Sequence, residues 1–332
     1  QETSVSETTS LPPETTLQTE SNFEKFINPL TGLPSTSVVQ NSRPVAVMLN
    51  NHLDSLPQYG ITQADIIYEI PVEGGITRFM AVYENYSTVP NVCSVRSCRY
   101  YFPLIANGLD AVYLHWGLDK SIAADTLKKY KIDHLDGGAV GAPLFGRDAE
   151  RKKSYALEHT AYLQGNNLES VLKQYKIRTE LDDNHKNKTV FTFLNEGQAI
   201  NSQESAVKAV LNFSNAYYST FTYDKASEKY LKQHSGKPQI DAKSKEQLSF
   251  KNLIILRTEI KSLKPGSVLL DVALNSGSGW YISDGKKLNI KWKRESDSSP
   301  IRIFNEDGTE LAINRGNSYI ALIGNDKNVS IS

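Results

Sequence analysis

The sequence predicts an α/β domain with a mixed sheet, followed by a β-rich α+β domain built on an antiparallel meander. Strand-like and helix-like segments alternate between residues 43 and 180, a pattern typical of α/β architecture. After the polar segment 181–188, the pattern changes to short strands separated by turn residues. A chain of 332 residues is long enough for two hydrophobic cores. We therefore place an α/β domain with a polar cleft at 26–182 and a β-rich domain at 189–332.

Residues 1–25 are predicted to form a disordered tether. The segment is rich in Ser, Thr and Pro, and its first 22 residues contain few bulky apolar side chains. Such a composition buries too little surface to offset the chain entropy lost on folding. Because the sequence shows neither an initiator Met nor an apolar signal core, we expect a mature or trimmed chain.

The α/β domain is predicted to begin with a buried strand at 44–49 and a β-hairpin at 65–84. Two apolar, β-prone runs flank Gly74 and Gly75 in the hairpin. This dipeptide fits a two-residue type I′ turn, because glycine accepts a positive φ angle without steric cost. We expect the two glycines to be the turn residues.

That turn would set the pairing of the two hairpin strands. It places Glu69 opposite Met80 and Pro71 opposite Arg78. Since side chains two residues apart share a face of a strand, Glu69, Glu73 and Arg78 would project from one side. The sequence therefore predicts two carboxylates held by a guanidinium group on a cleft floor, and a structural ion network is the alternative.

Three helices and one further strand are predicted in the rest of this domain. The first helix is expected to begin at Ser97 as N-cap and to continue to about residue 107, with Gly108 ending it. The others are expected at 121–130 and 167–175, and a buried strand is expected at 111–116.

The second domain is predicted to consist mostly of strands. One helix is expected near 205–212. The strand segments are 217–223, 229–231, 252–260, 267–274, 279–285, 287–293, 301–308 and 318–323.

Composition excludes several classes of protein. Lys plus Arg and Asp plus Glu number 37 each, so no net charge draws the chain to nucleic acid. No run of about 18 apolar residues could span a bilayer. The two cysteines, Cys93 and Cys98, match neither a zinc pattern nor a CxxC redox pair. We expect free thiols, and a disulfide that closes a small loop is the alternative.

Several sequence segments resemble the YerB-like lipoproteins, a bacterial extracytoplasmic family of unknown function. The resemblance to the N-terminal domain rests on NPLTGLP (28–34), RPVAVMLNN (43–51), QADIIYEIPVEGGITRFMAVY (63–83), VRSCRYYF (95–102) and LDAVYLHWG (109–117). The resemblance to the C-terminal domain rests on YDKASEKYLKQHSGKPQID (223–241), FKNLIIL (250–256), GSGWYISDGKK (277–287) and GNSYIALI (316–323).

The chain departs from this family at Cys98 and Tyr100, and Glu158-His159-Thr160 replaces the more common Pro-His-Asn. The resemblance implies a protein tethered to the outer face of the membrane of a Gram-positive-type bacterium. The resemblance also implies that the membrane contact is only through an N-terminal lipid anchor, which we expect to be absent from this chain. The resemblance implies no catalytic residues.

The candidate site residues come from the hairpin, the segment after it and the strand at 111–116. Carboxylates with a nearby histidine suit acid–base chemistry, and arginines at a helix N-terminus suit anion recognition. The candidates for catalysis are Glu69, Glu73 and His115, and those for ligand binding are Arg78, Arg96, Arg99, Asn51 and His159. For His115, a hydrogen-bonded core position is the alternative.

No cofactor or metal is predicted. His134, Asp136 and His159 match no established zinc spacing. The glycine-rich run 136–148 lacks both GxGxxG and GxxxxGK[ST], so we expect a mobile loop over the cleft.

Three functions remain open. The first is recognition of an envelope component, such as a wall glycan, a peptide or a partner protein, in the Glu/Arg/His cleft. The second is hydrolysis of an envelope polymer, with Glu69 or Glu73 as general acid/base and His115 as its partner. The third is a structural or assembly role that needs no cleft chemistry.

Overall fold

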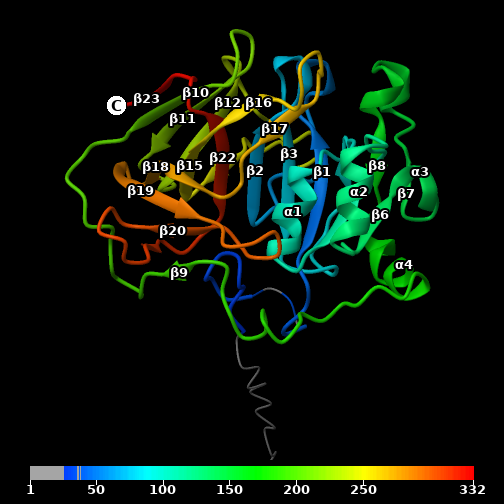
Figure 1. Ribbon diagram of the computed structural model, residues 1–332, viewed down its shortest axis with the longest axis horizontal. Helices are drawn as coiled ribbons and strands as arrows, with labels where there is room; N and C mark the ends of the chain where they lie inside the picture. The colour runs from blue at the N-terminus through cyan, green and yellow to red at the C-terminus, as the bar shows by residue number, and fades with distance from the viewer. Residues whose placement is uncertain (1–25, 36, 38) are drawn as a thin grey trace, which may run out of the picture.

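The computed structural model describes residues 26–35, 37 and 39–332, so the predicted tether lies outside the described part. Its central feature is a mixed ten-stranded sheet that runs through the whole body of the molecule (Figure 1). In spatial order, the strands are β20 (Arg302–Phe304), β19 (Lys286–Lys293), β18 (Ser276–Ser283), β15 (Asn252–Thr258), β22 (Ser318–Gly324), β2 (Ile66–Pro71), β3 (Thr77–Tyr83), β1 (Val45–Asn50), β5 (Val112–His115) and β6 (His134–Asp136).

Strands from both predicted domains form this sheet. β22 lies parallel to β2, with Tyr319 opposite Ile67, and joins the C-terminal strands to the N-terminal ones. The fold class is confirmed: the N-terminal part is α/β with a mixed sheet, and the C-terminal part is rich in antiparallel strands. The domain boundaries themselves stay a prediction.

Seven strands of the sheet run in one direction: β1, β2, β5, β6, β15, β19 and β22. Their carboxyl ends therefore share one side of the sheet, which we call the carboxyl edge, and their first residues share the opposite side, the amino edge. In open α/β sheets, ligands gather at the carboxyl edge.

A second sheet packs on one face of the main sheet, over the half that contains the C-terminal strands. Phe221, Tyr230 and Phe250 of the second sheet pack in one core with Phe79 and Tyr319 of the first. Its strands are β13 (Lys237–Pro238), β12 (Lys229–His234), β11 (Tyr218–Asp224), β10 (Lys208–Asn212) and β23 (Val329–Ile331), and β14 (Ser249–Phe250) pairs with β12.

The remaining elements are short. α1 (Tyr101–Gly108) and α2 (Ile122–Lys129) pack against the other face of the main sheet (Figure 1). The other helices are α3 (Gly137–Val140) and α4 (Leu168–Gln174), with single 3₁₀ turns η1 (Leu53–Ser55), η2 (Glu73–Gly75), η3 (Arg151–Lys153), η4 (Leu157–His159) and η5 (Gly165–Asn167). The small sheets are β4 (Val92–Cys93), β8 (Ala161–Leu163) and β7 (Phe145–Arg147); β16 (Ile260–Ser262) and β17 (Leu270–Val272); β9 (Thr192–Phe193) and β21 (Ala312–Ile313).

Most predicted elements are present close to their expected bounds. β1 is a run of apolar residues buried along its whole length, as expected for a strand covered on both faces. α1 ends at Gly108, and α2 and α4 lie within the predicted helices 121–130 and 167–175. Cys93 and Cys98 are buried free thiols.

Three local predictions were wrong. Ser97 does not cap α1, because residues 94–98 run as extended chain beside β1 and the helix begins only at Tyr101. Residues 208–212 form strand β10 rather than a helix, because they pair with β11 and β23. The glycine-rich run 136–148 is not one loop, since it contains α3 and β7.

The hairpin register was also predicted wrongly, by one residue. Glu73, Gly74 and Gly75 form a three-residue turn that the hydrogen bond from Val72 N to Ile76 O closes at 2.9 Å. Both glycines have a positive φ, as predicted. Because the turn takes one residue more than a type I′ turn, Glu69 lies opposite Phe79 instead of Met80.

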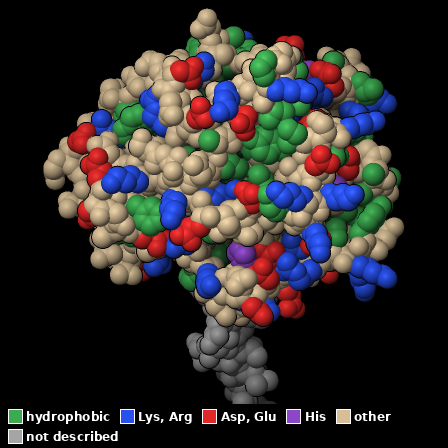
Figure 2. Space-filling view, viewed as in Figure 1, with side chains coloured by type: hydrophobic (Ala, Val, Ile, Leu, Met, Phe, Trp, Pro, Cys, Tyr) green, Lys and Arg blue, Asp and Glu red, His purple; other side chains and the backbone are tan. Residues whose placement is uncertain are grey.

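Acidic and basic side chains are interspersed over the face of the molecule that Figure 2 shows, in agreement with the zero net charge. Among the described residues, no helix has both the length and the apolar character needed to cross a membrane.

Candidate functional site

The shifted hairpin register separates the predicted carboxylate pair. Glu69 lies opposite Phe79, whereas Arg78 lies opposite Ile70, and neighbouring residues of a strand point to opposite faces. Glu69 and Arg78 are therefore on opposite faces of the hairpin. The prediction that Glu69, Glu73 and Arg78 share one face was wrong.

Glu69 is sealed between the two sheets. Its side chain has no exposed surface, and its Oε1 accepts hydrogen bonds from Thr77 Oγ1 at 2.7 Å and Asn51 Nδ2 at 3.1 Å. Its Oε2 accepts from Ser219 Oγ at 2.9 Å and Tyr319 Oη at 2.6 Å. Glu69 and Asn51 thus belong to a buried polar network and have no solvent-exposed surface that a ligand could reach.

Lys232 supplies the countercharge in this network. Its Nζ lies 3.4 Å from Glu69 Oε2 and donates to Ser219 Oγ and Gln239 Oε1. Burial is the largest single influence and would raise the pKa of Glu69. The charge of Lys232, together with that of His234 and the hydrogen bonds from Tyr319 and Thr77, outweighs burial and keeps that pKa below its usual value. The pair is an ionic link between the main sheet and β12.

On the other face, four charged residues gather at the carboxyl edge. Glu73 lies in the turn after β2, and Arg78 on β3 lies opposite Asn50, the last residue of β1. Arg96 lies beside the end of β1, where its backbone N–H donates to Met48 O. Arg99 follows just before α1. We call Glu73, Arg78, Arg96 and Arg99 the arginine edge.

Glu73 orders two of these guanidinium groups. Its carboxylate accepts a 2.8 Å hydrogen bond from Arg99 Nε and lies 3.3 Å from Arg78 Nη2. Burial would raise the pKa of Glu73, but the Arg99 hydrogen bond and the Arg78 charge hold it below its usual value. Burial and the nearby Arg99 charge lower the pKa of Arg78 to about 10. Arg78 Nη1 also donates to Ser97 O at 2.6 Å.

Positive charge exceeds negative charge at this edge. Glu73 is the one carboxylate that pairs with Arg78 or Arg99 among the described residues. Arg96 has only a distant partner, Glu158, whose Oε1 lies 3.7 Å from Nη2. The exposed fraction of the side chain rises from 4% for Arg78 to 14% for Arg99 and 27% for Arg96. The arrangement offers guanidinium N–H groups to an anion from solvent.

His159 is one of the predicted ligand-binding residues, and it lies beside Arg96. Both side chains lie 3.7 Å from Glu158 Oε1. Its Nδ1 accepts a 2.8 Å hydrogen bond from Asn50 Nδ2, and its ring stacks on His52 with centroids 5.7 Å apart. Burial lowers the pKa of His159. The structure thus brings His159 to the arginine edge, where its Nδ1 is already used as an acceptor.

His115 does not contact either glutamate. It is fully buried, and its Nδ1–H donates to Gly117 O at 2.9 Å because a carbonyl can only accept. Its Nε2 therefore accepts from His134 Nδ1–H, also at 2.9 Å. Burial lowers the pKa of His115 to about 4. His115 is a hydrogen-bonded core histidine, which was the alternative to a catalytic role.

Sequence reasoning did not assign site roles to Arg147 and Trp116, although they extend the basic surface. The Arg147 guanidinium stacks over the Trp116 ring at 4.3 Å, and its pKa is lowered by burial and by the charge of Arg96. The sequence contained no signal for this contact, because it joins β7 to the end of β5 across 31 positions of chain.

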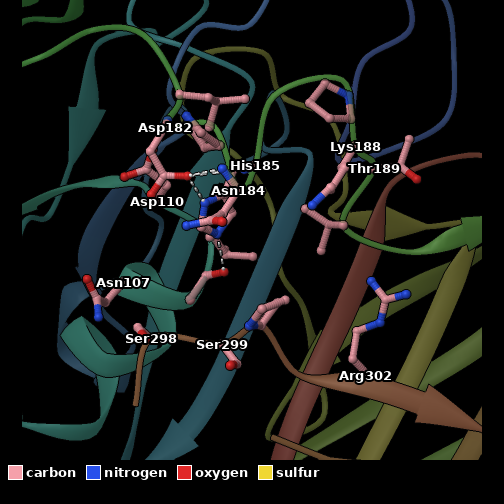
Figure 3. A pocket seen from close by; sticks show the side chains of 17 residues that line it. Asn107, Asp110, Asp182, Asn184, His185, Lys188, Thr189, Ser298, Ser299 and Arg302 are labelled. Atoms are coloured by element: carbon pink, nitrogen blue, oxygen red, sulfur yellow. Dashed lines mark hydrogen bonds and ion pairs between the residues drawn. The ribbon is translucent and has the colours of Figure 1, made fainter. Parts of the chain in front are cut away.

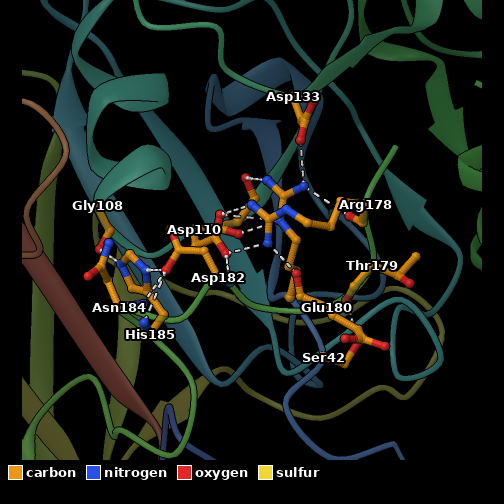
Figure 4. A network of polar contacts seen from close by, with 12 residues as sticks. Ser42, Gly108, Asp110, Asp133, Arg178, Thr179, Glu180, Asp182, Asn184 and His185 are labelled. Atoms are coloured by element: carbon orange, nitrogen blue, oxygen red, sulfur yellow. Dashed lines mark hydrogen bonds and ion pairs between the residues drawn. The ribbon is translucent and has the colours of Figure 1, made fainter. Parts of the chain in front are cut away.

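A cavity of about 530 Å³ lies at the opposite, amino edge (Figure 3). Asp110, Asp182 and His185 lie at its rim, close enough to one another for metal ligation. Their lone pairs are already used: Arg178 donates twice to Asp110, at 2.6 and 2.8 Å, and His185 Nδ1 lies 2.6 Å from Asp182 Oδ1 (Figure 4). This is an ion-pair network, and its contacts do not fit a metal centre.

Comparison with known proteins agrees with the sequence resemblance. Residues 30–178 match the model of the N-terminal domain of a protein of unknown function, DUF3048, and residues 209–320 match its C-terminal domain. The chain belongs to the DUF3048 family. Both domain models match in the expected order.

Two similar proteins extend this assignment. The chain is 29% identical over 315 residues to the Bacillus subtilis (strain 168) protein named "Putative lipoprotein YerB", covering 93% of this chain and 89% of the relative. The crystal structure of YerB protein from Bacillus subtilis superposes with a TM-score of 0.78 at 25% identity, covering 92% of this chain and all of that one. The fold is therefore shared along nearly the whole length.

Proposed function

We propose that this DUF3048 protein is an extracytoplasmic lipoprotein that binds an anionic group of an envelope component at the arginine edge. The observation that carries the proposal is the set of three guanidinium groups beside one carboxylate at the carboxyl edge of the sheet. Arg78 and Arg99 are held in place by Glu73, whereas Arg96 reaches solvent most freely. A preordered guanidinium group loses less side-chain freedom when an anion binds.

The contacts favour binding over hydrolysis. A general acid needs a carboxyl group whose pKa is raised toward the working pH, and one that reaches its substrate. Glu69 is buried away from solvent, and the pKa values of both Glu69 and Glu73 lie below their usual range. His115, the predicted partner, is hydrogen-bonded to Gly117 and His134.

The location rests on the relatives rather than on the fold. The Bacillus subtilis protein that matches 93% of the chain is named as a lipoprotein. We infer the same surface tethering for this chain, with residues 1–25 as the connecting segment. An envelope polymer or an envelope protein would then be the accessible partner.

The proposal is tested by retention of envelope material on the immobilised protein. Fragmented cell-wall material is passed over the wild-type protein and over the Arg96→Gln variant, and retained species are identified by mass spectrometry. A charge-assisted hydrogen bond contributes about 1.5–3 kcal/mol, so we expect roughly tenfold or greater loss of retention. Lys225→Gln, an exposed position outside the arginine edge, is the matched control.

Three outcomes decide the proposal. Retention of anionic species that falls only in the Arg96 variant supports it. Equal retention by both variants, or no retention by the wild-type protein, overturns it. Release of shortened species would instead support the hydrolase.

A further inference from the structure

We propose a second binding site, in the cavity at the amino edge, for a small molecule that joins an anionic group to an apolar body. A volume of about 530 Å³ is within the range of small-molecule sites. The cavity is also built at a junction, which is where such sites are concentrated. Its walls come from residues 107–110, 181–190 and 298–302, so the N-terminal part, the connecting segment and the C-terminal part all contribute.

One part of the wall is apolar and suits the body of the ligand. Its members are aliphatic side chains and prolines: Pro29, Pro44, Leu109, Leu181, Val190 and Pro300. A polar metabolite without an apolar part would leave the apolar side chains of this wall in contact with water. A ring or a short hydrocarbon chain would displace that water.

The other part of the wall carries positive charge. Figure 3 shows Lys188 and Arg302 on the same side of the cavity, across from His185. Lys188 has no ion-pair partner among the residues that the structure describes, and Arg302 pairs with Glu310 of the neighbouring chain segment. Ser299 adds a hydroxyl group to the lining.

The acidic residues at the rim do not cancel these cations. Asp110 is neutralised by Arg178, and Arg43 lies 3.5 Å from it, whereas Asp182 is bound to His185 (Figure 4). These five residues are engaged with one another, so Lys188 is the cation left for a ligand. The cavity therefore selects an anion rather than a cation.

This site is separate from the arginine edge. Pro44, in its lining, precedes the first residue of β1, whereas Arg78 lies opposite Asn50 at the last residue of the same strand. A strand of six residues spans about 20 Å. The two sites can be tested independently.

The test is a calorimetric titration of the full chain with three probes of one shape: phenyl phosphate, benzoate and neutral benzyl alcohol. We expect binding of one or both anions, and the preferred one identifies phosphate or carboxylate as the recognised group. Lys188→Gln should weaken anion binding about tenfold or more, because it removes the unpaired charge. Lys186→Gln, in the same segment but outside the lining, is the matched control and should leave binding unchanged.

A second variant separates a binding role from a structural one. Glu310→Gln removes the carboxylate that competes for Arg302, so it should tighten anion binding about threefold or more, which damage to the fold would not do. Equal affinity for benzyl alcohol and the anions would overturn the proposal. So would unchanged anion binding in Lys188→Gln, or no binding of any probe by the wild-type protein.

Discussion

The Nζ atom of Lys232 lies 3.4 Å from Oε2 of Glu69, and neither side chain has any exposed surface. Glu69 lies in the part of the chain that matches the N-terminal family domain, and Lys232 lies in the part that matches the C-terminal one. Together with the parallel pairing of β2 and β22, this ion pair joins the two parts into one packed body.

Lys232→Met is expected to destabilise the fold by about 3–5 kcal/mol, because it leaves the Glu69 carboxylate buried without a countercharge. Urea unfolding followed by circular dichroism measures the change. The double variant Lys232→Met with Glu69→Leu should recover a large part of the loss, since both charges are then absent. A loss below about 1 kcal/mol in the single variant would contradict the role given to the pair.

The separated N-terminal part, residues 26–188, is expected not to fold cooperatively. Without β22 and β12, strand β2 keeps β3 but loses its other neighbour, and Glu69 loses its countercharge. Circular dichroism and a thermal melt measure this directly. A sharp melting transition close to that of the full chain would show that the two parts are independent domains.

Stability is expected to fall as the pH drops from about 6.5 to 4. Burial lowers the pKa of His115 and of His234 to about 4, with the Lys232 charge adding to the effect at His234. Between these pH values the unfolded chain binds protons that the folded chain does not, so each histidine costs about 3 kcal/mol of stability at the acidic end. Urea midpoints across this range check the slope, and His234→Gln should flatten it. An unchanged slope in the His234→Gln variant would contradict the lowered pKa of that histidine.

Glu73→Gln is expected to lower stability by about 2 kcal/mol, because Arg78 is 4% exposed and loses its countercharge. Thermal unfolding measures the change. Glu158→Gln is the matched control: its carboxylate is 57% exposed and 3.7 Å from Arg96, so the change should be below about 0.5 kcal/mol. Equal melting temperatures for the two variants would mean that Glu73 does not order Arg78.

Local sequence patterns predicted most elements but not how they meet. The apolar run of β1 and the helix α4 follow from burial and from helical spacing, which are local properties. The segment before α1 was misjudged because its extended form depends on hydrogen bonds with Met48 and Ala161, far away in sequence. Residues 208–212 likewise became a strand through pairing with β11 and β23.

The candidate site was predicted in part. Arg78, Arg96, Arg99 and Glu73 do gather at one edge, because the turn after β2 and the segment before α1 are both at the carboxyl ends of strands. The turn has one residue more than predicted, which places Glu69 on the face opposite to Arg78. The sequence could not predict this, because two-residue and three-residue turns around Gly74 have similar residue preferences.

The most direct test of the central claim observes the arginine side chains themselves. Nitrogen-15 labelled protein is titrated with fragmented cell-wall material, and the Nε–H resonances of Arg78, Arg96 and Arg99 are assigned from single Arg→Lys variants. Anion binding at the arginine edge predicts saturable shifts of these resonances, weakened by added salt, while Arg257, on the distant strand β15, stays unchanged. Saturable binding that leaves all three resonances in place would contradict the claim.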